Sequence, residues 1–206
     1  MNCKKCESLC ASRTQIVEPD LPEFGRPCRV LVIGEAPGAD EDAQGKGFVG
    51  RSGRTLHALL EEHWLRRAFD YGCVNIVRCR PPENRRPSRD EIGNCLPFLA
   101  ETLERVNPEC LLLVGGTATA LFYGAGSLAA SIRELRRNNG RPRTGLAHPA
   151  LQGYLRGHAV RLIPMPHTSP LAWNRNAPDG RKWGEVGREQ VQIMARMLKT
   201  GTDDDR

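Results

Sequence analysis

The chain has 206 residues and a formal net charge of +6. This length suits one sizeable hydrophobic core and is a little short for two. No apolar stretch approaches the roughly 18 residues of a membrane span, and the first residues lack the apolar core of a signal peptide, so we expect a cytoplasmic protein. The basic charge favours a polyanionic partner such as nucleic acid.

Four short apolar runs predict buried β-strands. Their β-branched and leucine content, without polar alternation, is typical of a parallel sheet covered on both faces. Together with the helical patterns between them, they predict an α/β fold, a three-layer α/β/α sandwich around a mainly parallel four-stranded sheet. We expect a single domain over residues 1–199 and a disordered acidic tail over 200–206. The predicted strands are Arg29–Gly34, Val74–Arg78, Cys110–Gly115 and Val160–Met165.

Amphipathic patterns predict helices between and after the strands. Ser52 and Ser88 are candidate N-caps, and the helix that follows Ser88 should end near Pro108. Residues 135–146 form a basic segment punctuated by glycine and proline, which predicts a loop. Two helices should each bury one face, made of Leu56, Leu59, Leu60 and Trp64 in the first and of Val186, Gln190, Ile193, Met194 and Met197 in the last.

Eight cysteines in a cytoplasmic chain indicate metal or cluster ligation rather than a disulfide framework. Cys3 and Cys6 form a Cys-x2-Cys pair, and Cys79, directly after a predicted strand, can complete a set of four thiolates with Cys95. The spacing leaves Zn²⁺ and a [4Fe–4S] cluster both open. It also allows Cys10 to replace Cys3 or Cys6. The other three cysteines lie beside apolar runs and are expected in the core: Cys28, Cys73 and Cys110.

Six glycines lie between residues 34 and 53, after the first predicted strand. Glycines in this position let backbone N–H groups approach a ligand closely. The segment matches neither a P-loop nor a G-x-G-x-x-G fingerprint. It therefore predicts a loop that contacts a phosphate or a base, with Phe48 as its aromatic residue.

Two segments resemble motifs of the family 4 uracil-DNA glycosylases, which carry an iron–sulphur cluster. Residues 34–53 match the family's G-E-A-P-G-x-x-E-D-x-x-G-x-P-F-V-G-R-x-G, and residues 75–87 match its N-x-V-K-C-R-P-P-x-N-R-x-P. The resemblance covers most of the chain. It implies a DNA-repair enzyme that flips uracil out of DNA and hydrolyses its N-glycosidic bond, leaving an abasic site without strand cleavage. It also implies a structural [4Fe–4S] cluster, with the ligands Cys3, Cys6, Cys79 and Cys95.

The resemblance assigns roles to single residues. Phe48 should stack on the flipped uracil, which is worth roughly 1–3 kcal/mol and does not discriminate between bases. Asn75 should read the edge of the base, and His167 should stabilise the departing base as an anion. The base pocket should also be lined by Gly34, Glu35, Ala36 and Gly38.

Ala36 stands where the related family 1 enzymes carry the aspartate that positions the attacking water. We therefore expect Glu41 or Asp42 to take this catalytic role. Gly47 replaces the family's proline before Phe48, which should leave the ring on a more flexible segment. The last motif, usually H-P-S, reads His167-Thr168-Ser169, and residues 125–158 match the family poorly; these differences bear on the range of substrates.

Several residues are candidate DNA contacts. Leu171 could act as a wedge in the gap left by the flipped base, with Trp173 as an alternative. The remaining histidines are expected on helix surfaces or loops, with a functional role left open for His148: His57, His63, His148 and His158. The candidate phosphate contacts are Arg51, Arg80, Arg85, Arg86 and Arg175.

The expected partner is uracil-containing DNA, single- or double-stranded, bound by a monomer in the nucleoid of a prokaryote. Two other functions stay open: an iron–sulphur redox or sensor protein that binds DNA without catalysis, and a glycosylase that prefers deaminated purines such as hypoxanthine or xanthine. Relatives that form an irreversible complex with uracil-DNA carry a K-R-R-I-H insertion, and none occurs between Cys79 and Cys95.

Overall fold

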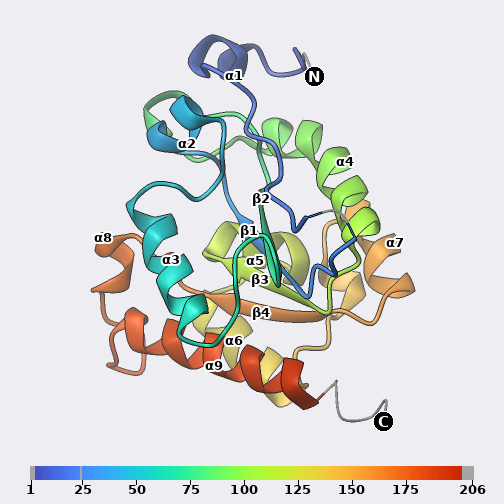
Figure 1. Cartoon of the computed structure of the whole chain (residues 1–206), viewed down its shortest axis with the longest axis vertical. Coiled ribbons are helices and arrows are strands. Elements are labelled where there is room, and N and C mark those ends of the chain that lie inside the picture. The colour runs from blue at the N-terminus through green and yellow to red at the C-terminus, as the bar shows by residue number, and fades with distance from the viewer. Residues whose placement is uncertain (1–2, 24, 201–206) are drawn as a thin grey trace.

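The computed structural model describes residues 3–23 and 25–200. Its centre is a four-stranded sheet in the order β2-β1-β3-β4, with every neighbouring pair parallel (Figure 1). The predicted α/β class and parallel sheet are therefore confirmed. The strands are β1 (Val30–Gly34), β2 (Tyr71–Asn75), β3 (Cys110–Val114) and β4 (Arg161–Met165).

Strand β2 lies earlier in the chain than the sequence pattern predicted. It pairs with β1 from Tyr71 opposite Val30 to Asn75 opposite Gly34, so both strands end together. Residues 76–79 stay buried without a strand partner. The prediction of a strand over 74–78 was wrong. Residues 76–78 are apolar or buried because they pack in the core, although they are not part of a strand. Cys79 consequently does not follow directly on a strand.

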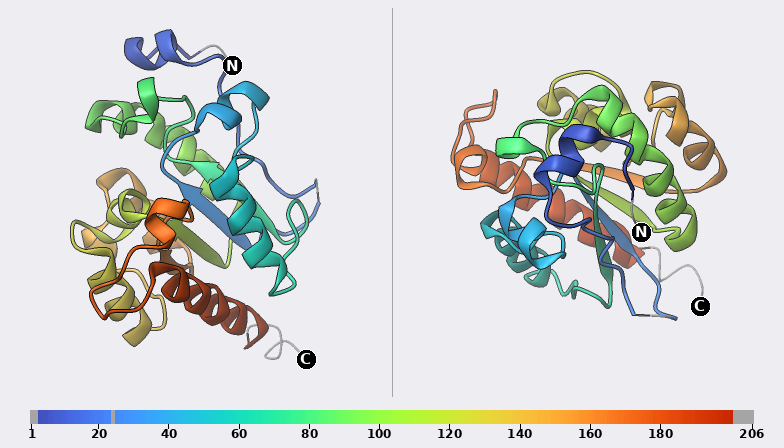
Figure 2. Two further views of the ribbon diagram at one scale, coloured as in Figure 1. Left: turned by 90° about the vertical axis from the view of Figure 1, so that its left-hand side faces the viewer. Right: turned by 90° about the horizontal axis from the view of Figure 1, so that it is seen from above.

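Helices cover both faces of the sheet, as Figure 2 shows. Leu31 and Ile33 of β1 share a core with α4 (Arg89–Val106), α5 (Gly116–Tyr123) and α7 (Pro149–Gly157). Val30 and Val32 face the opposite side and share a core with α3 (Arg51–Glu61) and α9 (Trp183–Thr200). This alternation follows the two-residue period of a strand and produces the three layers that the sequence predicts.

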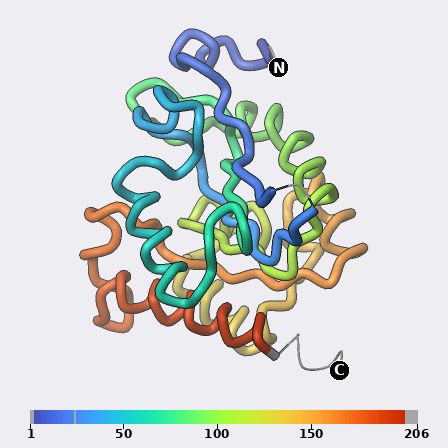
Figure 3. The backbone as a smooth tube through the Cα atoms, in the orientation of Figure 1, coloured from blue at the N-terminus to red at the C-terminus, as the bar shows by residue number. Residues whose placement is uncertain are grey.

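Shorter elements fill the connections. Helix α6 (Leu128–Arg137) contacts β4, and α1 lies at the opposite end of the molecule from α9 (Figure 1). The path of the chain brings α1 next to η1, far away in the sequence (Figure 3). The short elements are α1 (Glu7–Ser12), α2 (Ala39–Gln44), α8 (Pro170–Trp173) and the 3-10 turns η1 (Pro82–Asn84) and η2 (Thr144–Leu146).

The helix predictions hold in part. Ser88 caps α4 as expected: its hydroxyl accepts from Glu91 N–H at 3.1 Å, and the Glu91 carboxylate accepts from Ser88 N–H at 2.7 Å. Helix α3 begins after Gly50 rather than at a Ser52 cap. Trp64 was expected on the buried face of that helix but is 84% exposed, because it lies beyond the helix end with a left-handed φ of 65°. The segment predicted as a loop from residue 135 begins after Arg137, since buried Leu135 continues α6.

The described part of the chain, residues 3–23 and 25–200, has no helix long and apolar enough to cross a membrane. Helix α9 extends to Thr200, and residues 201–206 of the expected acidic tail lie outside the described residues. Because the strands are parallel, their carboxyl ends meet at one edge of the sheet. Ligands gather at this edge in open α/β sheets.

Candidate active site

A cavity of about 540 Å³ opens at the carboxyl ends of the strands. Its walls come from residues 34–41, 50–53, 84–86 and 114–117, together with Phe48, Asn75, His167 and Thr168. The loop after β1 therefore meets the ends of β2, β3 and β4, as the sequence analysis expected for a base pocket. Asp42, Arg80, Leu171 and Arg175 do not line the cavity.

One wall of the cavity is formed where Gly34, Phe48 and Asn75 meet. A Cβ atom built on Gly34 would lie 2.5 Å from Asn75 Oδ1 and 2.7 Å from Phe48 Cζ. Only glycine fits between the amide and the ring, so its role here is close approach rather than backbone freedom. The aromatic face and the amide are consequently held beside the same backbone position.

The Asn75 side chain is largely buried, but its amide is open to the cavity. The residue is 8% exposed, and neither amide atom forms a hydrogen bond with any residue in the described ranges. An amide at the end of β2 that is accessible from the cavity and has no protein partner can pair with a ligand there. It offers one acceptor and two donor hydrogens.

His167 enters the cavity from the loop after β4. Ser169 N–H donates to Nδ1 at 3.1 Å, so the hydrogen of the neutral ring lies on Nε2. The surrounding cavity walls desolvate the ring and lower the pKa of His167, an effect that the Glu35 carboxylate opposes. The arrangement keeps the ring neutral near pH 7 and leaves Nε2–H as a donor.

The acidic residues of the glycine-rich loop occupy different environments. Glu35 lines the cavity, and the Thr117 hydroxyl donates to its Oε2; among the described residues Oε1 has no hydrogen-bond partner. Glu41 also lines the cavity, but its two oxygens accept from Gly38 N–H at 3.0 Å and from Gly50 N–H at 2.8 Å. Glu41 thus joins the starts of α2 and α3, while Glu35 keeps one oxygen available.

Asp42, expected as an alternative catalytic carboxylate, points away from the cavity. The residue is 3% exposed, and its two oxygens accept from Thr14 N–H at 2.9 and 2.8 Å. Its buried charge therefore stabilises the N-terminal segment, and the structure does not bring it to the site. The sequence could not separate it from its acidic neighbours, because all follow the same loop.

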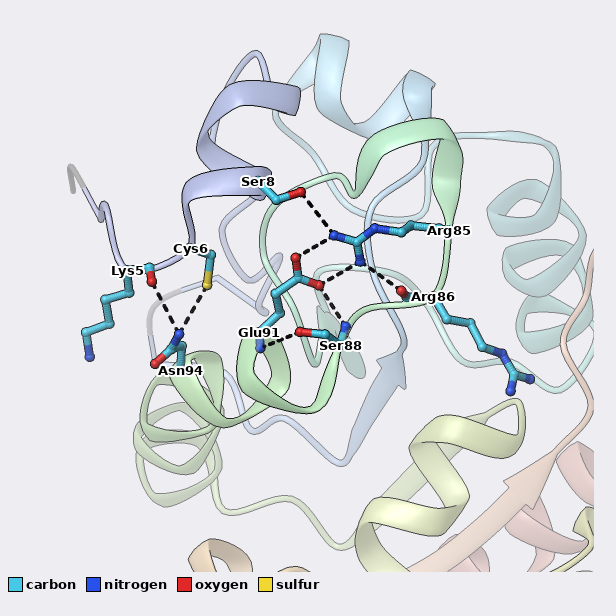
Figure 4. Close-up of polar contacts among 8 residues, drawn as sticks. All are labelled: Lys5, Cys6, Ser8, Arg85, Arg86, Ser88, Glu91 and Asn94. Atoms are coloured by element: carbon cyan, nitrogen blue, oxygen red, sulfur yellow. Dashed lines mark hydrogen bonds and ion pairs between the residues drawn. The ribbon is translucent and has the colours of Figure 1, made fainter.

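Of the candidate phosphate contacts, Arg85 is committed to protein groups (Figure 4). Its guanidinium donates to both oxygens of Glu91, at 2.7 and 2.8 Å, and to the Ser8 hydroxyl at 3.1 Å. Arg85 lowers the pKa of the Glu91 carboxyl, which the partial burial of that group opposes. The pair joins α1 to the first turn of α4.

The other candidate DNA contacts lie in and around the cavity mouth. Arg51 and Arg86 line the cavity and are exposed, and the side chain of Arg86 extends away from the Arg85 network (Figure 4). Arg80 donates to Asn84 Oδ1 at 2.9 Å. Arg175 is exposed outside the cavity.

Leu171 and Trp173 differ in how free they are to contact DNA. Leu171 is 80% exposed on α8, next to the His167 loop, as a wedge would require. The Trp173 ring packs on α9, where a Cβ on Gly187 would lie 2.4 Å from it. Packing therefore commits Trp173 to the fold, and Leu171 remains the accessible candidate.

Four of the predicted cluster ligands come from three places in the chain. Cys79 and Cys95 are buried, and Cys3 and Cys6 are half-buried. Arg13 donates to Cys79 Sγ at 2.8 Å and to the Cys3 carbonyl at 2.6 Å, and Asn94 donates to Cys6 Sγ at 3.4 Å. Burial raises the pKa of the Cys79 thiol, Arg13 lowers it, and the neighbouring Cys3 and Cys10 raise it.

The thiols are thus neighbours, although no group of three or more histidine, cysteine or acidic side chains within residues 3–23 and 25–200 is placed to hold one metal ion. A single Zn²⁺ requires four sulphurs within about 2.3 Å of one point. A cubane cluster spreads its ligands more widely, since each thiolate binds a different iron. Four cysteines are a donor set that an iron–sulphur cluster takes. Cys10 Sγ contacts the Cys3 carbonyl at 3.5 Å, which keeps it beside this group.

Comparison with known families adds to this geometry. Residues 22–186 match the model of the uracil DNA glycosylase superfamily. The chain belongs to this superfamily. A type-4 uracil-DNA glycosylase from Thermotoga maritima is 39% identical over 137 residues, which cover 66% of this chain and 68% of the relative.

Two further superfamily members show how far the similarity extends. A type-4 uracil-DNA glycosylase from Sulfurisphaera tokodaii is 35% identical over 138 residues, covering 66% of this chain and 60% of the relative. A type-5 uracil-DNA glycosylase from Pyrobaculum aerophilum is 31% identical over 231 residues, covering 99% of this chain and 89% of the relative.

In this superfamily member, sequence reasoning overlooked two residues of the site. Thr117 follows β3 and reaches Glu35, a contact that depends on two strand ends meeting. His57, expected on a helix surface, is half-buried behind Phe48. Burial, together with the nearby Arg67 charge, lowers the pKa of His57 to about 4. A histidine directly after Leu56 on the apolar side of α3 was the available signal.

We expect Arg85→Ala to lower the melting temperature and to leave the salt dependence of DNA binding unchanged, because its guanidinium is committed to Glu91 and Ser8. The matched variant Arg86→Ala removes the same charge one residue along. It should lower the salt slope by about one and leave the melting temperature unchanged. Calorimetry and DNA titrations at several salt concentrations measure both effects; the reverse pattern would return Arg85 to the DNA contacts.

Proposed function

We propose that this protein excises uracil from DNA by hydrolysing its N-glycosidic bond and leaves an abasic site without cutting the strand. The observation that carries the proposal is the Asn75 amide, which is open to the cavity without a protein partner beside the Phe48 ring. Membership of the superfamily and the names of the type-4 relatives support the same activity. The cavity is formed within one chain, which supports a monomer, acting on the DNA of the prokaryotic nucleoid.

The cavity walls suit recognition of a flipped base. A base inside a duplex is out of reach, so the enzyme must rotate the nucleotide into its pocket. Phe48 holds the ring by stacking, which every base accepts. Asn75 supplies the choice: its Oδ1 accepts from uracil N3–H, and its Nδ2 donates to O4. Cytosine presents the opposite pattern at these two positions and is rejected.

His167 assists the departure of the base. Breaking the glycosidic bond places negative charge on uracil, and a neutral Nε2–H donor beside O2 stabilises that anion. A ring that is already neutral needs no proton from solvent before it acts. The lowered pKa of His167 supports this assignment.

Glu35 is the carboxylate that we assign to the attacking water. Its Oε2 is held by Thr117 and its other oxygen is available, whereas both oxygens of Glu41 are used by backbone N–H groups. Asp42 lies outside the cavity. The role expected for Glu41 or Asp42 from the sequence therefore moves to Glu35, with Glu41 shaping the loop.

The DNA strand crosses the mouth of this cavity in the proposed complex. Arg51, Arg86 and Arg175 are exposed and supply phosphate contacts. Leu171 fills the gap in the base stack. These contacts involve one strand and its bases, so the proposal includes single- and double-stranded uracil-DNA.

Cys3, Cys6, Cys79 and Cys95 would hold a [4Fe–4S] cluster. When bound, this group supplies a covalent cross-link between the N-terminal segment and the 79–95 segment, since hydrolysis of a glycosidic bond transfers no electrons. Arg13 and Asn94 donate to two of these sulphurs, contacts that would also orient cluster-bound sulphurs.

The activity is tested with matched oligonucleotides that contain uracil, hypoxanthine, xanthine, thymine or cytosine at one position. We expect release of uracil, and a loss of at least about 10²-fold for Asn75→Asp, because an ionised carboxylate cannot donate to O4. Binding of undamaged DNA by Asn75→Asp serves as the control for folding. Release of a purine alone, or of no base, would reject uracil excision by this protein.

Single-turnover rates distinguish the three carboxylates. We expect Glu35→Gln to slow uracil excision by about 10²-fold, in the range of one general base, with an unchanged melting temperature. Asp42→Asn should lower the melting temperature and slow excision far less, since it acts through Thr14. Full activity of Glu35→Gln, combined with a slow Glu41→Gln or Asp42→Asn, would return the water to the residues expected from the sequence.

Anaerobically purified protein should contain about four irons per chain and absorb broadly in the visible range. Cys79→Ser and Cys95→Ser should each lose most of the iron. Cys10→Ser should retain it, because four other thiols complete the ligand set, and Cys28→Ala provides a control outside the site. Stoichiometric zinc without iron would contradict the cluster assignment. Iron loss in Cys10→Ser would show that Cys10 is a cluster ligand in place of Cys3 or Cys6.

A further inference from the structure

The Phe48 ring stands on a segment that no regular element supports. Residues 45–50 contain neither helix nor strand, only an isolated bridge from Lys46 to Glu18, and Phe48 itself has a φ of 59°, in the left-handed region. This conformation is unfavourable for a non-glycine residue and persists only where surrounding contacts impose it. The position of the ring therefore depends on what holds the neighbouring backbone.

Gly47 increases the need for contacts that hold the backbone beside Phe48. A Cβ at Gly47 would meet nothing closer than 3.9 Å, so crowding does not require a glycine here. Glycine has more backbone freedom than any other residue and adds to the entropy lost when the segment is ordered. A fixed Phe48 thus needs attachment points close to Gly47.

Two side chains supply these points from behind the ring. Arg67 Nη2 donates to the Gly47 carbonyl at 2.7 Å, and His57 Nε2 lies 3.0 Å from the Phe48 carbonyl oxygen. Arg67 Nη1 lies 2.8 Å from the same ring nitrogen. Arg67 therefore anchors the Gly47 carbonyl directly, and His57 lies against both the Phe48 carbonyl and the Arg67 guanidinium.

Each of these side chains is itself held. Asp20 accepts from Arg67 Nε at 2.6 Å, and the Tyr71 hydroxyl lies 2.8 Å from His57 Nδ1. Because a guanidinium can only donate, Nε2 of the neutral ring accepts from Arg67 Nη1, and the ring carries its hydrogen on Nδ1, which donates to the Tyr71 hydroxyl. Tyr71 is fully buried at the start of β2, the strand that ends at Asn75.

Most of the groups around His57 oppose a second proton on its ring. Burial disfavours the charged ring, and Arg67 and Lys46 carry positive charge nearby, whereas Asp20 is the one negative group that favours it. The neutral, single-donor state therefore persists through the neutral pH range. A protonated ring would place two positive groups side by side within this network.

We propose that His57 and Arg67 are positioning residues for base recognition: Arg67 clamps the Gly47 carbonyl, His57 holds the Arg67 guanidinium in place, and together they fix the stacking ring relative to Asn75. Neither residue lines the cavity, so neither touches the base. The inference rests on the proposed uracil excision and deepens it, because it assigns affinity for the flipped base to a network behind the pocket.

The test uses duplex DNA that contains 2′-fluoro-2′-deoxyuridine, whose fluorine disfavours the sugar cation and blocks cleavage, and the same DNA with thymidine instead. Arg67→Met and His57→Leu should each bind the uracil analogue about tenfold more weakly, part of the gain from stacking, with unchanged affinity for the thymidine DNA. Arg66→Met is the matched control, since Arg66 carries the same charge but pairs with Asp70 and stacks on Phe69.

A double-mutant cycle with Phe48→Leu separates positioning from general destabilisation. If the network acts through the ring, Arg67→Met should cause little further loss of analogue affinity once Phe48 is leucine. His57→Gln should restore part of the affinity lost in His57→Leu, because its amide oxygen can accept from the Arg67 guanidinium. Melting temperatures show which variants remain folded.

Four outcomes would overturn the proposal. Equal losses for Arg67→Met in the presence and absence of Phe48 would overturn it, as would wild-type analogue affinity in both Arg67→Met and His57→Leu. Equal losses for Arg66→Met would assign the effect to charge and overturn it as well. If the wild-type protein and Arg66→Met both bind analogue and thymidine DNA equally, the proposed uracil recognition fails first, and the clamp with it.

Discussion

The absence of a side chain at Gly34 is the constraint on which the candidate site depends. Strands β1 and β2 end in register, so Gly34 lies directly beside Asn75. Phe48 reaches the same place from a loop that leaves the sheet and returns to it. An amide and an aromatic ring can face one small volume only because the residue between them occupies almost none. The surrounding network serves to keep these two groups in place.

Several charged side chains that look functional in the sequence have a structural role instead, as hydrogen-bond acceptors for backbone N–H groups. Glu41, Asp42 and Glu91 each satisfy backbone N–H groups at the start of a helix or in the N-terminal segment. Long connections contain many such donors without a strand or helix partner, and leaving them buried and unpaired is costly. In a loop-rich chain, some acidic side chains therefore accept hydrogen bonds from backbone N–H groups, and fewer are available for catalysis.

Local sequence signals predicted much of the architecture, because strands, caps and amphipathic faces depend on neighbouring residues. Ser88 and three of the four strands are examples. The failures concern contacts set by the path of the backbone. Arg85 turns back onto Glu91 because Glu83 and Asn84 adopt left-handed φ values of 53° and 55°, and Thr117 meets Glu35 because β1 and β3 are neighbours. Spacing alone contains neither piece of information.

The segment between Asn75 and Cys79 has a consequence for how the chain can vary. Ile76 and Val77 donate to the carbonyls of Gly34 and Glu35 at 2.9 and 3.0 Å, and the Arg78 carbonyl accepts from Val17 N–H at 2.8 Å. These three backbone hydrogen bonds tie the stretch to the loop after β1 and to the N-terminal segment. One inserted or deleted residue would turn the following side chains to the opposite side and move Cys79 away from Arg13. Local repacking can accommodate single substitutions in residues 76–78, but insertions and deletions between Asn75 and Cys79 should not be tolerated.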